Sequence, residues 1–212
     1  MTPTIVAVSG FSSDAGKTTL LCKLLRAFPG WEAIKITRGH YRSCGKDPHA
    51  CCVSHLLGRE PVIRSGREET YAPGKDTGRY WDAGASNVHW LIATDGQVEQ
   101  GIEQALARVQ AAGVFVEGTS FLNYLDVNYA LMAARPVDGK LKPSARRALP
   151  KTSAIYLFED DGDEPENARE QFASWCLTSA DARLLRDLPV CTSSDLPQLI
   201  AHIRAIHTKI AA

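Results

Sequence analysis

The sequence predicts an α/β fold of three layers, in which a mainly parallel β-sheet lies between two layers of helices. Short apolar segments typical of buried strands alternate along the chain with segments whose apolar residues recur at helical spacing. A glycine-rich turn joins the first predicted strand to the first predicted helix, as in open α/β sheets that bind ligands at the carboxyl edge. The length of 212 residues suits one domain, so we expect residues 1–212 to form one.

The amino-terminal part predicts a strand, a helix and a second strand. Residues 4–9 are a compact apolar run and predict a buried strand. Residues 17–28 carry apolar side chains at helical spacing, and Pro29-Gly30 ends that helix. Residues 31–37 predict the second strand. Residues 38–87 have no dominant period, and only short helices are expected there, near 52–58 and 77–84.

The rest of the chain continues the alternation of strands and helices. The predicted strands are 88–94, 113–118, 129–135 and 153–159, and the predicted helices are 98–112, 166–176, 180–186 and 196–211. An acidic loop is expected at 159–166. Residues 140–149 are expected to form a solvated loop and a short helix, although they include Lys140, Lys142, Arg146 and Arg147. Because crossovers between parallel strands are right-handed in nearly all cases, we expect strand 4–9 near the middle of the sheet.

The segment GFSSDAGKTT, residues 10–19, has the features of a phosphate-binding loop. It lies between a predicted strand and a predicted helix, where unpaired backbone N–H groups and the helix dipole attract anions. Lys17 would reach the β- and γ-phosphates of a nucleotide, and Thr18 would place its hydroxyl on Mg²⁺. The segment therefore predicts a P-loop NTPase fold, with nucleotide contacts from Gly10, Ser12, Ser13, Asp14, Ala15, Gly16, Lys17, Thr18 and Thr19.

The first glycine of this segment stands one position earlier than in the common pattern. Five residues, from Phe11 to Ala15, separate Gly10 from Gly16. A loop of this length resembles those of a P-loop branch that contains dethiobiotin synthetase, cobyrinic acid amidases and several metal-centre maturation GTPases. The resemblance implies that the early glycine belongs to a longer loop.

A second acidic position fits the same site. The apolar strand VFVEG ends at Glu117-Gly118. A carboxylate at the tip of a strand beside the phosphate loop can hold Mg²⁺ through water. The alternative is a capping or solvent-facing glutamate, and the presence of the loop favours the metal role for Glu117.

Three stretches resemble motifs of the molybdopterin-guanine dinucleotide biosynthesis protein B family. They are SGFSSDAGKTTLLCKLL, PGKDTGRYWDAGAS (residues 73–86) and VFVEG, and all fall within residues 9–118. The resemblance implies GTP binding with Mg²⁺, slow hydrolysis, a homodimer and assistance to a nucleotidyltransferase that completes the molybdenum cofactor. It also implies that Lys75, Asp76, Thr77 and Arg79 lie near the phosphates, with Asp76 holding Mg²⁺ or orienting water. Lys17 and Asp76 are then the expected catalytic residues.

The chain departs from that family after the second strand, where it carries a Cys/His-rich insertion at about residues 38–72. Thiolates and imidazoles favour Zn²⁺, Cu⁺ or Fe–S centres. If this segment binds Zn²⁺ or Ni²⁺, the first candidate ligands are Cys44, Cys51 and Cys52, followed by His49 and His40. Adjacent cysteines would fit a site shared across a dimer axis, which resembles nickel-insertion GTPases. The alternative is a loop whose cysteines are inert.

Composition and charge limit the partners. Lys plus Arg equals Asp plus Glu, at 24 each, which gives no electrostatic argument for nucleic-acid or membrane binding. No apolar run approaches the length of a membrane span, and the amino terminus lacks the pattern of a secretion signal. We therefore expect a cytoplasmic protein with no nucleic-acid or membrane partner.

Three functions remain open at this point. The first is a slow GTPase that serves as an adapter in molybdenum-cofactor or other metal-cofactor maturation, with a nucleotidyltransferase or metalloenzyme as partner. The metal-cofactor role includes, as an alternative, a nickel or zinc metallochaperone GTPase. The second is an ATP-dependent ligase or kinase of the dethiobiotin or cobyrinate type. The third is a non-catalytic metal-binding or storage module with a vestigial nucleotide site, against which the intact Lys17, Thr18 and Glu117 argue. An Asn-Lys-x-Asp guanine motif is absent, so GTP is favoured over ATP by the resemblance alone. Base recognition is expected near LFEDD, residues 157–161.

Overall fold

A computed structural model of the chain describes residues 2–39, 53–136, 141–159, 164–179 and 181–211. Eight strands form one sheet in the order β3-β4-β2-β5-β1-β6-β7-β8. Seven strands run parallel, and β3 pairs antiparallel with β4 at one edge. The strands are β1 (Thr4–Gly10), β2 (Glu32–Arg38), β3 (Val62–Ser65), β4 (Val88–Ala93), β5 (Gly113–Glu117), β6 (Tyr129–Ala134), β7 (Ala154–Leu157) and β8 (Val190–Cys191).

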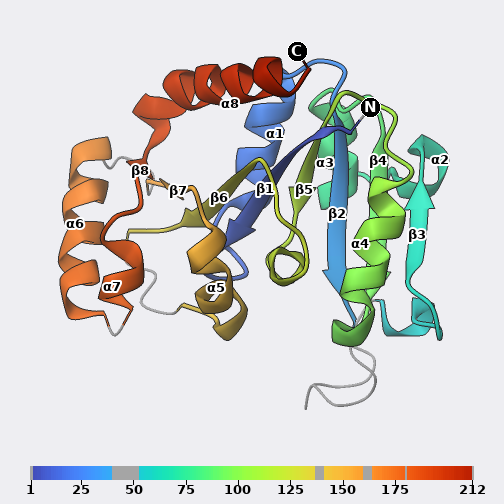
Figure 1. Cartoon of the computed structure of the whole chain (residues 1–212), viewed down its shortest axis with the longest axis horizontal. Coiled ribbons are helices and arrows are strands. Elements are labelled where there is room, and N and C mark those ends of the chain that lie inside the picture. The colour runs from blue at the N-terminus through green and yellow to red at the C-terminus, as the bar shows by residue number, and fades with distance from the viewer. Residues whose placement is uncertain (1, 40–52, 137–140, 160–163, 180, 212) are drawn as a thin grey trace.

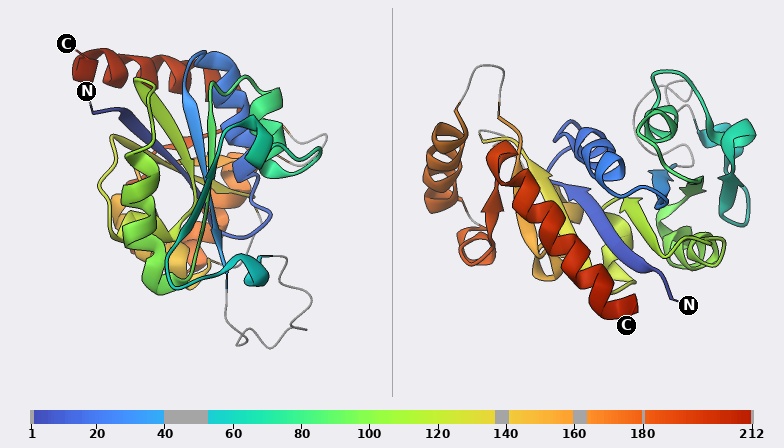
Figure 2. Two further views of the ribbon diagram at one scale, coloured as in Figure 1. Left: turned by 90° about the vertical axis from the view of Figure 1, so that its right-hand side faces the viewer. Right: turned by 90° about the horizontal axis from the view of Figure 1, so that it is seen from above.

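Helices cover both faces of the sheet and so form the three layers that the sequence predicts (Figures 1 and 2). One face carries α1 (Lys17–Ala27), α3 (Asp76–Asp82) and α8 (Leu196–Ala211), whose apolar side chains share a core with β1 and β5. The other face carries α4 (Val98–Leu106), α5 (Pro143–Ala148), α6 (Pro165–Thr178) and α7 (Ala182–Leu185). The short helix α2 (Arg67–Thr70) connects β3 towards α3.

Successive side chains of the central strand β1 point alternately into the two hydrophobic cores. Val6 and Val8 of β1 face the core of α1, whereas Ile5 and Ala7 face the core of α4 and α5. All seven residues of β1 are buried, which is the pattern expected of a central parallel strand with helices on both sides. This confirms the predicted position of the first strand and leaves its carboxyl end near the middle of one sheet edge.

Several predicted boundaries are wrong, and the contacts explain why. The helix predicted over 98–112 ends at Leu106. The backbone N–H groups of Gln110 and Ala111 donate instead to the Glu32 carboxylate, each at 2.9 Å from N to Oε1. The edge strands β3 and β8 and the helix α2 were not predicted. Each has two to four residues, too few to show a period.

Candidate functional site

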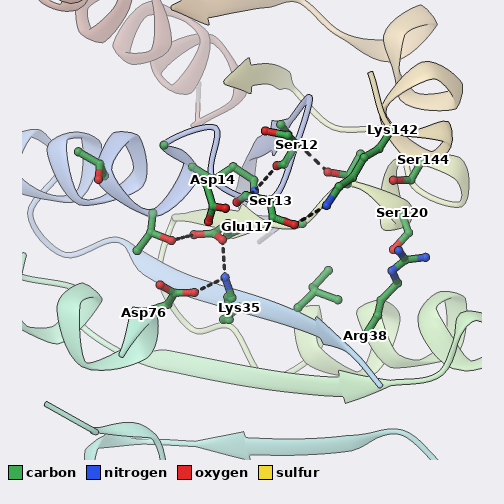
Figure 3. A pocket seen from close by; sticks show the side chains of 18 of the residues that line it. Ser12, Ser13, Asp14, Lys35, Arg38, Asp76, Glu117, Ser120, Lys142 and Ser144 are labelled. Carbon is green, nitrogen blue, oxygen red and sulfur yellow. Dashed lines mark hydrogen bonds and ion pairs between the residues drawn. The ribbon is translucent and has the colours of Figure 1, made fainter. Parts of the chain in front are cut away.

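The carboxyl ends of β1, β2 and β5 meet at a cleft of about 540 Å³ beside the loop that joins β1 to α1 (Figure 3). The register of the strands brings these ends together, because Val8 of β1 pairs with Glu117 of β5, and Glu117 pairs with Lys35 of β2. Most of the predicted nucleotide contacts line this cleft: Gly10, Ser12, Ser13, Asp14, Gly16, Lys17, Thr18, Thr19, Asp76, Arg79 and Glu117. Ala15 is buried outside the cleft lining.

Two glycines allow the loop backbone to pack closely against the side chains of Phe158 and Lys17. Gly16 has φ of 84°, a conformation that favours glycine, and a Cβ there would lie 2.4 Å from Cδ2 of Phe158. A Cβ on Gly10 would lie 2.9 Å from Cγ of Lys17. Phe11 anchors the loop from below, since its N–H donates to Ala133 O at 3.0 Å and its carbonyl accepts from Lys142 N at 3.1 Å. The loop is thus held at its amino-terminal end, and Ser12, Ser13 and Asp14 line the cleft.

Lys17 lies along the loop with its ammonium at the cleft. Nζ donates to Ser12 O at 3.0 Å and to Ser13 O at 2.9 Å. Burial lowers the pKa of Lys17; the charge of Glu117 opposes this effect and that of Lys35 adds to it. Lys142, which precedes α5, adds a second ammonium that contacts the Ser13 hydroxyl. Positive charge therefore surrounds the concave side of the loop, where an anion is favoured.

Glu117 lies at the centre of the site and is almost fully buried. Its side chain is 1% exposed. Oε2 accepts a hydrogen bond from Thr18 Oγ1 at 2.8 Å and another from the buried Tyr80 hydroxyl, while Oε1 contacts the Lys35 ammonium. Burial, followed by the neighbouring Glu117 carboxylate, raises the pKa of Tyr80 well above its ordinary value, so Tyr80 stays a hydrogen-bond donor at neutral pH.

Asp76, the first residue of α3, completes this group. Its Oδ2 lies 2.5 Å from Lys35 Nζ. Burial favours the neutral acid, but the charge and hydrogen bond of Lys35 and a hydrogen bond from Thr18 hold the pKa of Asp76 below its usual value. Burial likewise opposes the charge on Lys35, yet Glu117 and Asp76 raise its pKa. Asp76 and Lys35 are therefore both charged at neutral pH.

The oxygen atoms in this group fit Mg²⁺. Mg²⁺ prefers hard oxygen ligands and is commonly bound through one or two carboxylates together with substrate phosphates. The Thr18 hydroxyl and the carboxylates of Glu117 and Asp76 supply such oxygens within one hydrogen-bonded group. These are the three residues predicted to hold Mg²⁺.

The remaining predicted residues lie in three places. Arg79 lies beside the loop, where Nη2 donates to Thr19 Oγ1 at 3.1 Å. Lys75 lies outside the cleft lining and borders a neighbouring cavity of about 760 Å³, which shares Lys35 and Asp76 with the cleft. The candidate zinc or nickel ligands Cys44, His49, Cys51 and Cys52 lie outside the described residues, as does His40. Within the described part of the chain, no group of three or more His, Cys, Asp or Glu side chains could hold a metal.

Sequence reasoning missed three members of the site. One feature of the sequence could have identified Lys35: a charged residue in the interior of a buried strand needs a partner of opposite charge. No feature of the sequence could have identified Tyr80, because its role depends on how α3 packs against β5. Lys142 was expected on a solvated loop, whereas the structure brings its ammonium to Ser13.

Comparison with known proteins supports the fold. No protein-family model matches the chain, and no curated protein matches it. HypB from Helicobacter pylori, solved in complex with nickel, is similar over 99% of this chain and 86% of its own, with a TM-score of 0.50 and 13% identity. The order of the strands, the glycine-rich loop after the central strand and this similarity all indicate the same fold. The chain has a P-loop NTPase fold.

A second solved structure is similar to part of the chain. LpxK from Aquifex aeolicus, in complex with ATP, has a TM-score of 0.46 and 16% identity over 74% of this chain. The chain spans about half the length of LpxK, at 48%. None of the helices in the described P-loop NTPase fold has both the length and the apolar character needed to cross a membrane.

Proposed function

We propose that this protein binds a nucleoside triphosphate with Mg²⁺ in the cleft at the phosphate loop and hydrolyses it slowly. The observation that carries the proposal is the convergence of the Lys17 ammonium, the Thr18 hydroxyl and the buried Glu117 carboxylate beside one glycine-rich loop. The loop backbone and Lys17 would bind the β- and γ-phosphates, and Thr18, Asp76 and Glu117 would hold the metal. Mg²⁺ would there neutralise charge on the phosphates.

The contacts of the arginines that line the cleft support slow turnover. Arg38 Nη1 pairs with Asp95 Oδ1 at 2.8 Å, and Arg79 donates to Thr19. Arg135 Nε donates to the carbonyl of Asp14 at 3.4 Å. An arginine that stabilises the transition state in such enzymes is worth orders of magnitude in rate, and these three are directed to protein groups. We infer that a partner or a second copy accelerates hydrolysis.

The biological role that we propose is an adapter in metal-cofactor maturation. The three motifs within residues 9–118 that resemble the molybdopterin-guanine dinucleotide biosynthesis protein B family support a role in making the molybdenum cofactor. The same resemblance supports GTP as the nucleotide, a homodimer and a nucleotidyltransferase as the partner. ATP remains the alternative nucleotide, and an ATP-dependent ligase the alternative enzyme.

A second candidate function is metal delivery. The cysteines and histidines of residues 40–55 favour it, because thiolates and imidazoles bind Zn²⁺ and the adjacent Cys51 and Cys52 suit a site shared across a dimer axis. The similarity to HypB supports this candidate only through the shared fold.

Titration of the full chain with fluorescent GTP and ATP analogues, with Mg²⁺, tests the proposal. We expect micromolar binding of one nucleotide, and a loss of at least about tenfold for Lys17→Ala, which removes a charged phosphate contact. Lys151→Ala is the matched control, because that lysine pairs with Asp126 on the surface. Absence of binding of either nucleotide by the wild-type chain would refute the proposal. Metal analysis of wild type and Cys51→Ser tests the second candidate.

A further inference from the structure

We propose that Lys35 is a tethered cation that holds the divalent-metal position, so that its ammonium and Mg²⁺ compete for the same two carboxylates. This inference rests on the proposed function, because it concerns the metal that would accompany the nucleotide. It assigns to Lys35 a role that the phosphate loop alone does not supply, namely control over when the metal enters.

The position of the ammonium is the first argument. Lys35 of β2 pairs in register with Glu117 of β5, so the two side chains lie side by side on one face of the sheet. Nζ contacts Oε1 of Glu117 and lies 2.5 Å from Oδ2 of Asp76 (Figure 3). The Thr18 hydroxyl is bonded to the same Glu117 carboxylate through Oε2. The ammonium therefore lies among the three oxygen-bearing groups that fit Mg²⁺.

The charge balance is the second argument. Glu117 and Asp76 together carry two negative charges, and Lys35 neutralises one of them. The side chain of Lys35 is 16% exposed and that of Glu117 is 1% exposed, so solvent screens this pair poorly, whereas Asp76 is 40% exposed and is screened more. A divalent ion added beside the ammonium would leave a net positive site. Entry of Mg²⁺ therefore requires either departure of the ammonium or arrival of further negative charge.

A bound triphosphate would provide that negative charge. Lys35 lines both the cleft and the neighbouring cavity, so its ammonium has space to leave the carboxylates without leaving the site. The consequence is an order of events. The nucleotide-free protein binds Mg²⁺ weakly, and nucleotide and metal enter together.

An ion pair with only a structural role makes a different prediction. Removal of Lys35 would then leave the buried Glu117 carboxylate beside the partly exposed Asp76 carboxylate with no cation between them, and would simply destabilise the fold. Competition predicts a gain as well, because the two carboxylates freed from the ammonium become available to a metal. The measurable difference is the affinity of the nucleotide-free protein for the metal alone.

The test uses the full chain without nucleotide and Mn²⁺ as the probe, with free Mn²⁺ followed by electron paramagnetic resonance. We expect Lys35→Gln to bind Mn²⁺ at least about tenfold more tightly than wild type, given the close charges in a poorly screened site. Arg38→Gln is the matched control: Arg38 lies on the same strand and lines the same cleft, but it pairs with Asp95. Equal affinities for wild type and Lys35→Gln would overturn the proposal, as would an equal gain in Arg38→Gln.

Thermal stability gives a second readout that does not depend on activity. Mg²⁺ should raise the melting temperature of Lys35→Gln and leave that of wild type unchanged. If Lys35→Gln fails to fold without metal, recovery of its fold by Mg²⁺ supports competition, and failure to recover overturns it. Nucleotide binding by wild type in the presence of Mg²⁺ is measured separately, so a failure of the proposed function is distinguishable from a failure of this inference.

Discussion

The hydroxyl of Tyr80 offers the most direct test of how the buried carboxylate at the centre of the site is stabilised. Tyr80→Phe keeps the ring, which is 0% exposed, and removes one donor to Glu117. Glu117 retains Thr18 and Lys35, so it is not left without partners. A hydrogen bond to a charged group contributes about 1.5–3 kcal/mol, and we therefore expect a loss of about 2 kcal/mol in the free energy of unfolding.

Urea denaturation at pH 7, followed by tryptophan fluorescence, measures this loss. With a urea dependence of about 2 kcal/mol per molar, the midpoint should fall by about 1 M. Tyr124→Phe is the control, because Tyr124 is 46% exposed, and its midpoint should change by less than about 0.3 M, as for most surface substitutions. Equal midpoint shifts for the two variants would refute the claim that the Tyr80 hydroxyl stabilises the buried carboxylate.

The same variant has a defined dependence on pH. The folded state holds the pKa of Tyr80 well above that of the unfolded chain, which is about 10. Above that pH the unfolded chain releases a proton that the folded chain keeps, so stability falls as pH rises, by up to about 1.4 kcal/mol per pH unit. Tyr80→Phe lacks this proton, so the stability difference between wild type and variant should be constant below about pH 9 and shrink above pH 10.

Three further predictions concern the fold around the site. Gly16→Ala should lower the free energy of unfolding, measured by urea denaturation, by about 2–4 kcal/mol, because it combines an unfavourable φ of 84° with a clash against Phe158. The control Gly30→Ala, with φ of 83° and no atom within 4 Å of the added Cβ, should lose only about 1–2 kcal/mol. Equal losses would argue against the clash. Glu32→Ala should lower stability by about 3 kcal/mol or more, since the N–H groups of Gln110 and Ala111 and the ring of His89 all lose their acceptor, and hydrogen exchange at those two amides should accelerate. Asp195→Asn should flatten the loss of stability in acid. Burial opposes the charge on Asp195, but hydrogen bonds from Thr192 and Arg169 lower its pKa, so its contribution is present above about pH 4 and is lost as pH falls through the folded value. Parallel acid unfolding curves for wild type and Asp195→Asn would contradict that assignment.

The phosphate loop was predictable because its features are local. Gly10, Gly16 and Lys17 stand within one turn between a strand and a helix, and the strand that ends at Glu117 is a plain apolar run. Helical spacing likewise predicted α1 and α8 within one or two residues. The prediction needed no knowledge of distant contacts.

The rest of the site depends on contacts between segments far apart in the chain. Lys35 meets Glu117 only because β2 lies directly beside β5, and Tyr80 reaches Glu117 from α3. Strand order and register are set by side-chain packing over the whole sheet, and no single segment records them. The helix that ends early at Leu106 has the same cause, since Glu32 competes for its later amides from a distance of 78 residues along the chain.

Both borders of the sheet are short, and this bears on how copies of the protein can associate. The strand at one border has four residues and the strand at the other has two. Such borders present few free backbone groups, so a second chain would gain little by extending the sheet. Self-association would then use side-chain surfaces, such as the rim of the cleft or the outer sides of the helices. Assembly through the cleft rim would make its strength depend on what the cleft holds.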